Sequence, residues 1–185
     1  ALFNEEFGAK DIMKFANSCD KFAKSNLLVT DENLNTHQLF DQINKNINYV
    51  FVDYLNLVPT QKKYPSRTQQ VAGVLNELKQ LAVSKKTVVV VLAQLNRGIA
   101  GRSNRRPNPE DIRETRDLKS VDKMYFVYRP DYYADKSLAV QENVNMEIIE
   151  YDKSKNFVGT FVTQFNKKNS QISCFENAFQ GIIYE

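Results

Sequence analysis

The sequence has few of the residues that build metal centres and disulfide frameworks. It contains two cysteines and one histidine in 185 residues. Cys19 and Cys174 lie far apart, with neither the C-x-x-C spacing of a zinc or redox site nor the cysteine density of a small secreted domain. His37 has no metal-ligand companions. We therefore expect no metal centre of this kind and no disulfide framework, and we expect both cysteines to be reduced packing residues in a cytoplasmic protein.

Long hydrophobic runs are also missing. No apolar segment approaches the roughly 20 residues that span a bilayer, and no charged segment followed by an apolar one opens the chain. With 42% hydrophobic residues, the chain is long enough to bury one ordinary core without metals or disulfides. We expect no association with membranes, and a single domain over residues 1–185.

Positive charge is concentrated in one segment. The whole chain carries a net charge of +3, which by itself indicates no particular partner. Residues 97–116, the basic loop, hold six arginines and three acidic residues, so this segment has an excess equal to that of the whole chain. The loop is long, which favours a functional or mobile segment. A surface that binds phosphates is one interpretation, and a solvated loop with no partner is the other.

The apolar spacing predicts alternating helices and strands. Helices are expected at residues 5–24, 35–45 and 66–82, the last two opening on Asn35 and Ser66, each followed by a glutamine three residues later as in a capping box. Strands are expected at residues 26–31, 49–58, 87–95, 124–129, 146–151, 158–165 and 172–175. Residues 49–58 are nearly continuously apolar, which is typical of a parallel strand covered on both faces. The expected fold class is α/β, with a mostly parallel sheet flanked by helices and an antiparallel C-terminal extension.

Two polar side chains fall near the carboxyl ends of the central strands, where open α/β sheets bind ligands. Asp53 either holds Mg²⁺ through water, as a Walker B aspartate does, or starts a turn, and this segment alone favours neither. Gln94 either senses a phosphate, with Arg97 following its movement, or is a strand-end amide satisfied by backbone. Taken alone, Gln94 is better explained as a strand-end amide.

Several segments, taken in order, resemble the motor domain of DnaB-type replicative helicases. F-V-D-Y-L-N-L-V at residues 51–58 is similar to the Walker B motif I-D-Y-L-Q-L, and A-Q-L-N-R at 93–97 is similar to the sensor motif S-Q-L-N-R. R-R-P-N-P-E-D-I-R-E-T at 105–115 resembles the DNA-loop motif K-R-P-x-x-x-D-L-R-E-S-G, and F-V-Y-R at 126–129 resembles the F-I-Y-R after it. Their order and spacing make the resemblance more specific than any single motif.

The resemblance implies a RecA-like P-loop NTPase core that uses ATP and Mg²⁺. By it, the catalytic residues are Asp53, which positions Mg²⁺, and Gln94, which senses the γ-phosphate. The expected DNA-binding residues of the basic loop are Arg97, Arg105, Arg106, Arg113, Glu114 and Arg116. The implied activity is ATP-dependent 5′ to 3′ unwinding by a homohexameric ring on single-stranded DNA, with primase or a helicase loader as further partners.

Parts of the family pattern differ in this sequence. No G-x-x-x-x-G-K-[ST] occurs, so the amide nest and the lysine that cradle phosphates are missing from these residues. We therefore expect the chain alone neither to bind ATP tightly nor to hydrolyse it. The family's K-x-R-N-G, which supplies a lysine and an arginine finger to the neighbouring subunit, aligns with D-K-S-K-N and places Asp152 and Ser154 at those positions. Lys153 or Lys155 is the candidate replacement, although lysine lacks the planar fork of arginine. Arg116 stands where the DNA loop has glycine.

The sequence thus favours an ATP-dependent replicative DNA helicase seen without its phosphate-binding loop. The alternative is a non-catalytic single-stranded DNA-binding or ring-assembly paralogue. Asp152 and Ser154 favour that alternative, whereas the retained Asp53 and Gln94 disfavour it. A recombinase or clock-type ATPase of the same fold is a third interpretation, in which R-P-x-x-x-D-I-R-E would be unexpected.

Overall fold

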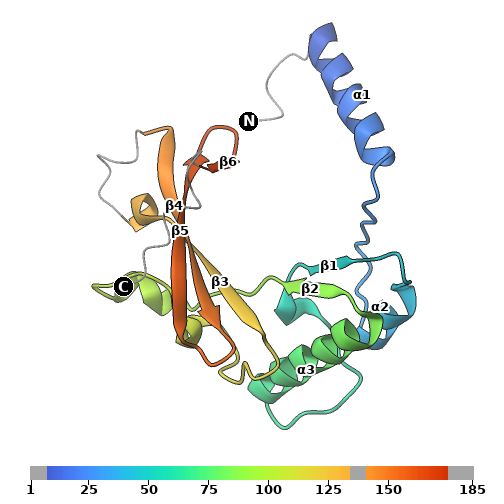
Figure 1. The fold of residues 1–185 in the computed structure, drawn as a ribbon, viewed down its shortest axis with the longest axis vertical. Helices are drawn as coiled ribbons and strands as arrows, with labels where there is room; N and C mark the ends of the chain where they lie inside the picture. Colours follow the sequence, from blue (N-terminus) through green and yellow to red (C-terminus); the bar gives the residue numbers. More distant parts are fainter. Residues whose placement is uncertain (1–7, 134–140, 175–185) are drawn as a thin grey trace. The chain divides into compact units, whose positions relative to one another are not determined.

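The computed structural model describes residues 8–133 and 141–174, and the chain divides into two compact units, Ala1–Glu32 and Asn33–Glu185. Each unit is described by itself. The first contains α1, Ala9–Ala23 (Figure 1). This confirms the helix expected at residues 5–24, of which residues 5–7 lie outside the described ranges. None of the residues of α1 is buried.

The strand expected at residues 26–31 is wrong. This segment pairs with neither of the two sheets found in the described residues, and Leu27, Leu28 and Val29 are exposed. A strand forms where its N–H and C=O groups pair with a neighbouring strand. An apolar composition indicates burial but does not supply that partner.

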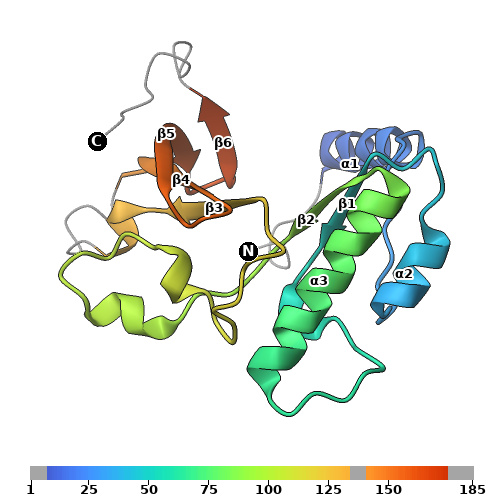
Figure 2. The same ribbon diagram turned by 60° about the horizontal axis from the view of Figure 1, so that its bottom comes forward.

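A parallel pair of strands and two helices form the first half of the second unit (Figures 1 and 2). β1, Tyr49–Val52, pairs with β2, Val88–Val91, in register from Tyr49↔Val88 to Val52↔Val91. α3, Arg67–Lys85, connects the two strands, which confirms the expected strand, helix, strand unit. α2, Thr36–Gln42, packs on α3 and opens with the expected capping box at Asn35. It ends three residues before the expected 45.

Within the described residues of this unit, the parallel pair is covered on one face. Val89 and Val91 pack against the core, whereas Tyr49, Phe51 and Val88 are exposed. The prediction of burial on both faces is therefore wrong here. β1 is also shorter than the expected residues 49–58, because the chain turns after Val52 into a 3-10 helix at Leu55–Leu57.

Four antiparallel strands form the second half of this unit. They are β3, Lys123–Tyr128; β4, Asn143–Asp152; β5, Phe157–Asn166; and β6, Gln171–Cys174. Their order in the sheet follows the chain, β3-β4-β5-β6. The antiparallel extension expected from the sequence is confirmed, and Phe175, the expected end of the last strand, lies outside the described residues. Further 3-10 helices lie at Arg97–Gly101, Pro109–Asp111 and Pro130–Tyr133.

One hydrophobic core joins the two halves. α3 contributes Val71, Val74, Leu75 and Leu78, and the segment after β2 contributes Ile112 and Leu118. Met124 and Phe126 of β3, Ile149 of β4 and Leu55 after β1 complete the core. Ile112 belongs to the basic loop and is buried, so this part of the loop packs in the core.

Both cysteines are free and exposed, so the predicted packing role is wrong. Cys19 lies on α1, which has no buried face, and Cys174 ends β6, all of whose residues are exposed. In the described ranges, the helices are all too short or too polar to cross a membrane.

Candidate functional site

Asp53 and Gln94 lie near the same edge of the parallel pair. Asp53 directly follows β1, and Gln94 follows the end of β2 at Val91. Backbone pairing continues past the strands, since Leu92 N donates to Val52 O over 2.9 Å and Leu55 N donates to Leu92 O over 2.8 Å. Asp53 and Gln94 are both exposed. The structure thus brings the two predicted catalytic residues to the carboxyl edge, as parallel strands require.

The basic loop folds back on the segment that carries Gln94. Asn96 N donates to Asp111 O and Arg113 N donates to Gln94 O, each over 2.8 Å, and Leu95 forms an antiparallel bridge with Ile112. The side chains of the same two residues also meet, since Arg113 Nη1 donates to Gln94 Oε1 over 3.3 Å. A loop residue that is predicted to bind DNA therefore contacts the predicted phosphate sensor.

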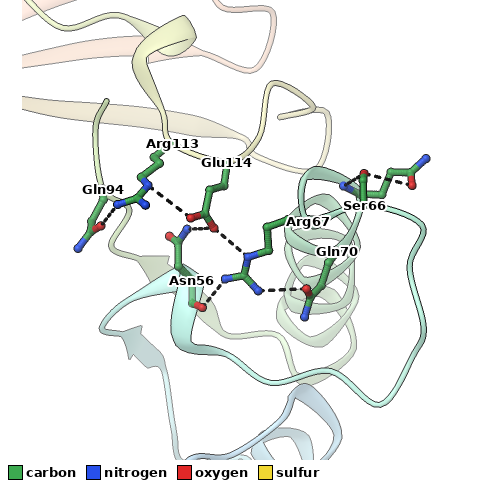
Figure 3. A network of polar contacts seen from close by, with 8 residues as sticks. Asn56, Ser66, Arg67, Gln70, Gln94, Arg113 and Glu114 are labelled. Atoms are coloured by element: carbon green, nitrogen blue, oxygen red, sulfur yellow. Dashed lines mark hydrogen bonds and ion pairs between the residues drawn. The ribbon is translucent and has the colours of Figure 1, made fainter. Parts of the chain in front are cut away.

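Glu114 connects this contact to two further segments (Figure 3). Its Oε2 accepts from Asn56 Nδ2 over 2.6 Å and from Arg67 Nε over 2.9 Å. Its Oε1 lies 3.4 Å from Arg113 Nε. Arg67 also donates to Asn56 O over 2.6 Å and to Gln70 Oε1 over 3.1 Å. We call these side chains the Glu114 network: Asn56, Arg67, Gln70, Gln94, Arg113 and Glu114.

Electrostatics favour the ionised form of Glu114. The hydrogen bond from Arg67 is the main reason that the pKa of Glu114 lies below its ordinary value, and the bond from Asn56 acts in the same direction. Partial burial opposes these effects and is outweighed. Both hydrogen bonds are stronger to a carboxylate than to a neutral carboxyl group, so Glu114 is a carboxylate at neutral pH.

Sequence reasoning missed Asn56 and Arg67 as members of this site. Asn56 interrupts an apolar segment, and Arg67 is the first residue of a helix that begins at an N-cap serine. Both features are visible in the sequence. Neither indicates that the side chains contact Glu114, which lies 58 positions after Asn56 and 47 positions after Arg67. The available signal was Asn56 itself, because a polar side chain within an apolar segment needs a hydrogen-bond partner when it is buried.

Three arginines of the basic loop bind partners within the protein. Arg102 forms a bidentate ion pair with Asp111, in which Nη1 donates to Oδ1 over 3.0 Å and Nη2 donates to Oδ2 over 2.8 Å. Arg105 Nη1 donates to Tyr133 O over 2.7 Å, and Arg106 Nη2 donates to Thr160 Oγ1 over 2.9 Å. These arginines are half-buried, whereas Arg97, Arg113 and Arg116 are exposed. The role of Arg105 and Arg106 in DNA binding stays a prediction, and the fold already uses both guanidinium groups.

The candidate interface lysines lie in the turn between β4 and β5. Lys155 Nζ donates to Glu110 Oε1 over 2.9 Å and to Arg116 O over 3.2 Å, so this turn contacts the basic loop. The bond from Lys155 lowers the pKa of Glu110. Asp152 accepts from the backbone N–H groups of Ser154 and Asn156 and thereby builds the turn. Lys153 is exposed.

A cavity of about 590 Å³ joins the exposed groups near the strand edge. It is lined by Gln94, Leu95, Asn96, Arg97 and Arg113. Two guanidinium groups and two amides can bind a phosphate through charge and hydrogen bonds. Asp53 offers one exposed carboxylate near the same edge, which suits Mg²⁺, since that ion keeps most of its waters and binds one or two carboxylates. Among the described residues, no group of three or more His, Cys, Asp or Glu side chains is placed so that it could hold a metal ion.

Comparison with known families gives a match over most of the chain. The family model described as DnaB-like helicase C terminal domain matches residues 2–176. The chain is 37% identical over 125 residues to the replicative DNA helicase DnaC of Bacillus subtilis (strain 168), a match that covers 64% of this chain and 27% of that relative. The matched part therefore spans about a quarter of the relative's length.

Two solved structures are similar to the chain. A DnaB-like replicative helicase, solved in work on its interactions with primase, matches with a TM-score of 0.79 and 25% identity over 94% of this chain and 44% of that chain. A second solved structure, of an ATPase domain, matches with a TM-score of 0.78 and 26% identity over 92% of this chain and 62% of that chain. These matches confirm the expected RecA-like α/β fold.

Proposed function

The chain belongs to the DnaB-like helicase C-terminal domain family, and on that premise we infer that it is the part of a replicative DNA helicase that couples ATP hydrolysis to movement along single-stranded DNA. The observation that supports this most directly is the contact between Arg113 and Gln94. Gln94 is the proposed sensor of the γ-phosphate and Arg113 a proposed DNA ligand. A change at one of them would therefore act on the other through direct hydrogen bonds, one from the Arg113 side chain and one from its backbone N–H.

The proposed roles follow from the placement of the side chains. Asp53 would hold Mg²⁺ through water at the strand edge, and Mg²⁺ would supply charge neutralisation at the phosphates during hydrolysis. The exposed arginines Arg97, Arg113 and Arg116 would contact the DNA backbone, because phosphate contacts need donors and positive charge rather than a base sequence. Arg105, Arg106 and Glu114 would shape the loop that carries them.

The assembly that we propose is a hexameric ring of identical subunits that moves 5′ to 3′ in the cytoplasm. In such a ring, Lys153 or Lys155 would face the nucleotide of a neighbouring subunit. Primase is the partner of the solved DnaB-like helicase, and primase or a loader is the proposed partner of the complete protein. These proposals rest on the family.

Binding of single-stranded DNA at different salt concentrations tests the proposal. Each lost phosphate contact should reduce the slope of log Kd against log salt by about 0.7 for single strands. Arg113→Glu together with Arg116→Glu should therefore flatten the slope by about 1.4 and weaken binding. The matched control reverses two exposed lysines outside the basic loop, Lys45→Glu with Lys63→Glu, and should keep the wild-type slope. An unchanged slope in the arginine variant would remove the basic loop from the DNA interface.

A second candidate is a non-catalytic DNA-binding or ring-assembly paralogue. The turn between β4 and β5 favours it, because Asp152 stands at the position of the family lysine and accepts from the backbone of its own turn. The two candidates differ in one measurement on the protein isolated from its source cell. DNA-stimulated ATP hydrolysis that is lost in Asp53→Asn supports the helicase, and DNA binding without hydrolysis supports the paralogue.

A further inference from the structure

Glu114 has an unusual backbone conformation for a residue with a side chain. Its φ is 68°, in the left-handed region. This region is disfavoured for residues that carry a Cβ and is adopted mainly where the surroundings hold the residue in place. The side chain is turned toward the protein and is 24% exposed. A residue whose main role was to face DNA would not need either feature.

Arg67 and Asn56 both donate to Glu114 Oε2, and of the two Arg67 is anchored to a long helix. It is the first residue of α3, directly after the N-cap Ser66, and is therefore fixed to a helix whose apolar residues enter the core. Its guanidinium contacts Glu114, Asn56 O and Gln70 together (Figure 3). A planar guanidinium can hold several acceptors at set angles, which a lysine cannot do.

Glu114 contacts Arg113 through its side chain, since Glu114 Oε1 lies 3.4 Å from Arg113 Nε. The two residues are adjacent, so the left-handed backbone at Glu114 sets the direction in which the chain leaves Arg113. Arg113 in turn bonds to Gln94 through both its backbone N–H and its side chain. A path of contacts thus runs from the start of α3 through Glu114 to the proposed sensor.

We propose that Arg67 is a positioning residue that fixes the carboxylate of Glu114 and thereby keeps Arg113 against Gln94. Glu114 then acts on DNA through Arg113 and is not itself a DNA ligand. The consequence for DNA binding rests on the proposed function, whereas the positioning of the loop does not. An ordinary exposed ion pair would contribute little and would leave the loop unchanged when broken.

Hydrogen exchange of the 185-residue chain tests the positioning without DNA. The variants are Arg67→Met, Glu114→Gln and the double substitution, with Lys79→Met as the control that removes one cation from the same helix. Exchange of the peptide covering residues 112–116 should be faster by roughly two- to tenfold in both single variants, the factor expected for loss of one hydrogen bond. The double variant should add little, because both changes act on the same contact, between Arg67 and Glu114.

Two results of this experiment would overturn the proposal. One is wild-type exchange at residues 112–116 in Arg67→Met, which would show that the loop keeps its conformation without the guanidinium. The other is an equal acceleration in Lys79→Met, which would show a general loss of stability. Lys79 pairs with Asp122, which is not a member of the Glu114 network, so this control separates the two causes.

Binding of single-stranded oligothymidylate gives a second readout, namely whether Glu114→Gln strengthens or weakens the affinity for DNA. Neutralising an acidic residue beside DNA should strengthen binding if only charge matters. Glu114→Gln should instead weaken binding severalfold, because Arg113 loses its position, and tighter binding would contradict the proposal. If the wild-type chain binds no DNA, the proposed function fails, and the exchange experiment still decides the role of Arg67.

Discussion

At the scale of single residues, arginines of the basic loop take two kinds of role. Arg102, Arg105 and Arg106 are half-buried and bind acceptors of the protein, whereas Arg97, Arg113 and Arg116 are exposed, and of these three Arg113 also donates to Gln94. The charge of the segment is visible in the sequence, but the division between the two groups is not. It depends on which guanidinium lies near a carboxylate, a carbonyl or a hydroxyl after folding.

Asp111 should be important for stability because it organises the middle of the basic loop. It is 8% exposed, binds Arg102 through both oxygens and accepts from Asn108 N over 3.0 Å. Asp111→Asn keeps the shape and removes the charge, so it should lower the free energy of unfolding by roughly 1.5 to 3 kcal/mol, the range for hydrogen bonds to charged groups. Urea unfolding followed by circular dichroism measures this loss.

The control for this prediction is Asp122→Asn. Asp122 also pairs with a cation, Lys79, but its side chain is 72% exposed. An exposed substitution of this kind should change the free energy of unfolding by about 0.5 kcal/mol or less. Equal losses in the two variants would mean that burial of Asp111 has no part in its contribution.

At the scale of elements, helix starts are more predictable than strand lengths. Asn35 forms the expected capping box, and Ser66 caps α3 by accepting from Gln69 N but without the return bond of a box. A capping side chain and the amides that it accepts from lie within three residues, so such starts can be found locally. β1 and β2 each hold four residues and are shorter than expected. Their ends depend on where the partner strand stops and where the chain turns, which are not local properties.

The N-cap of α3 provides a prediction at this scale. Ser66 accepts from Gln69 N over 3.2 Å, and Ser66→Ala should lower the free energy of unfolding by about 1 kcal/mol. Ser84→Ala near the other end of the helix is the control, since the Ser84 hydroxyl donates to the carbonyl oxygens of Gln80 and Leu81 and caps no amide. Thermal unfolding compares them, and a larger loss in the Ser84 variant would contradict the capping role.

At the scale of the whole molecule, the second unit joins a parallel pair to an antiparallel sheet through one core. α3, the basic loop and β3 all contribute to that core. The side chains of the site therefore come from separate segments of the chain: Asp53 and Asn56 after β1, Arg67 on α3, Gln94 after β2, and Arg113 and Glu114 in the basic loop. Their arrangement depends on the core that holds these segments.

ATP hydrolysis by the 185-residue chain should be undetectable. The chain has the strand edge with Asp53 and Gln94 but lacks the G-x-x-x-x-G-K-[ST] motif that cradles phosphates. Release of inorganic phosphate, with and without single-stranded DNA, measures the activity, and Asp53→Asn identifies any contaminating ATPase. Turnover by the wild-type chain that disappears in Asp53→Asn would contradict the prediction.

The sequence by itself determined the family, most elements and the strand edge that carries Asp53 and Gln94. These follow from local patterns: motif order, apolar spacing and capping residues within a few positions of one another. The family match and the RecA-like fold agree with that prediction. The strand predicted at residues 26–31 and the packing role of the cysteines were wrong, because both depend on neighbours that composition does not specify.

Only the tertiary structure decided which polar groups meet. Asn56, Arg67 and Glu114 lie on separate segments and are joined because α3, the end of β1 and the basic loop lie around one core. The same is true of Lys155 and Glu110, which connect the turn between β4 and β5 to the loop. Hydrogen bonds between distant segments depend on distances and angles fixed by packing, and local sequence patterns carry no information about them.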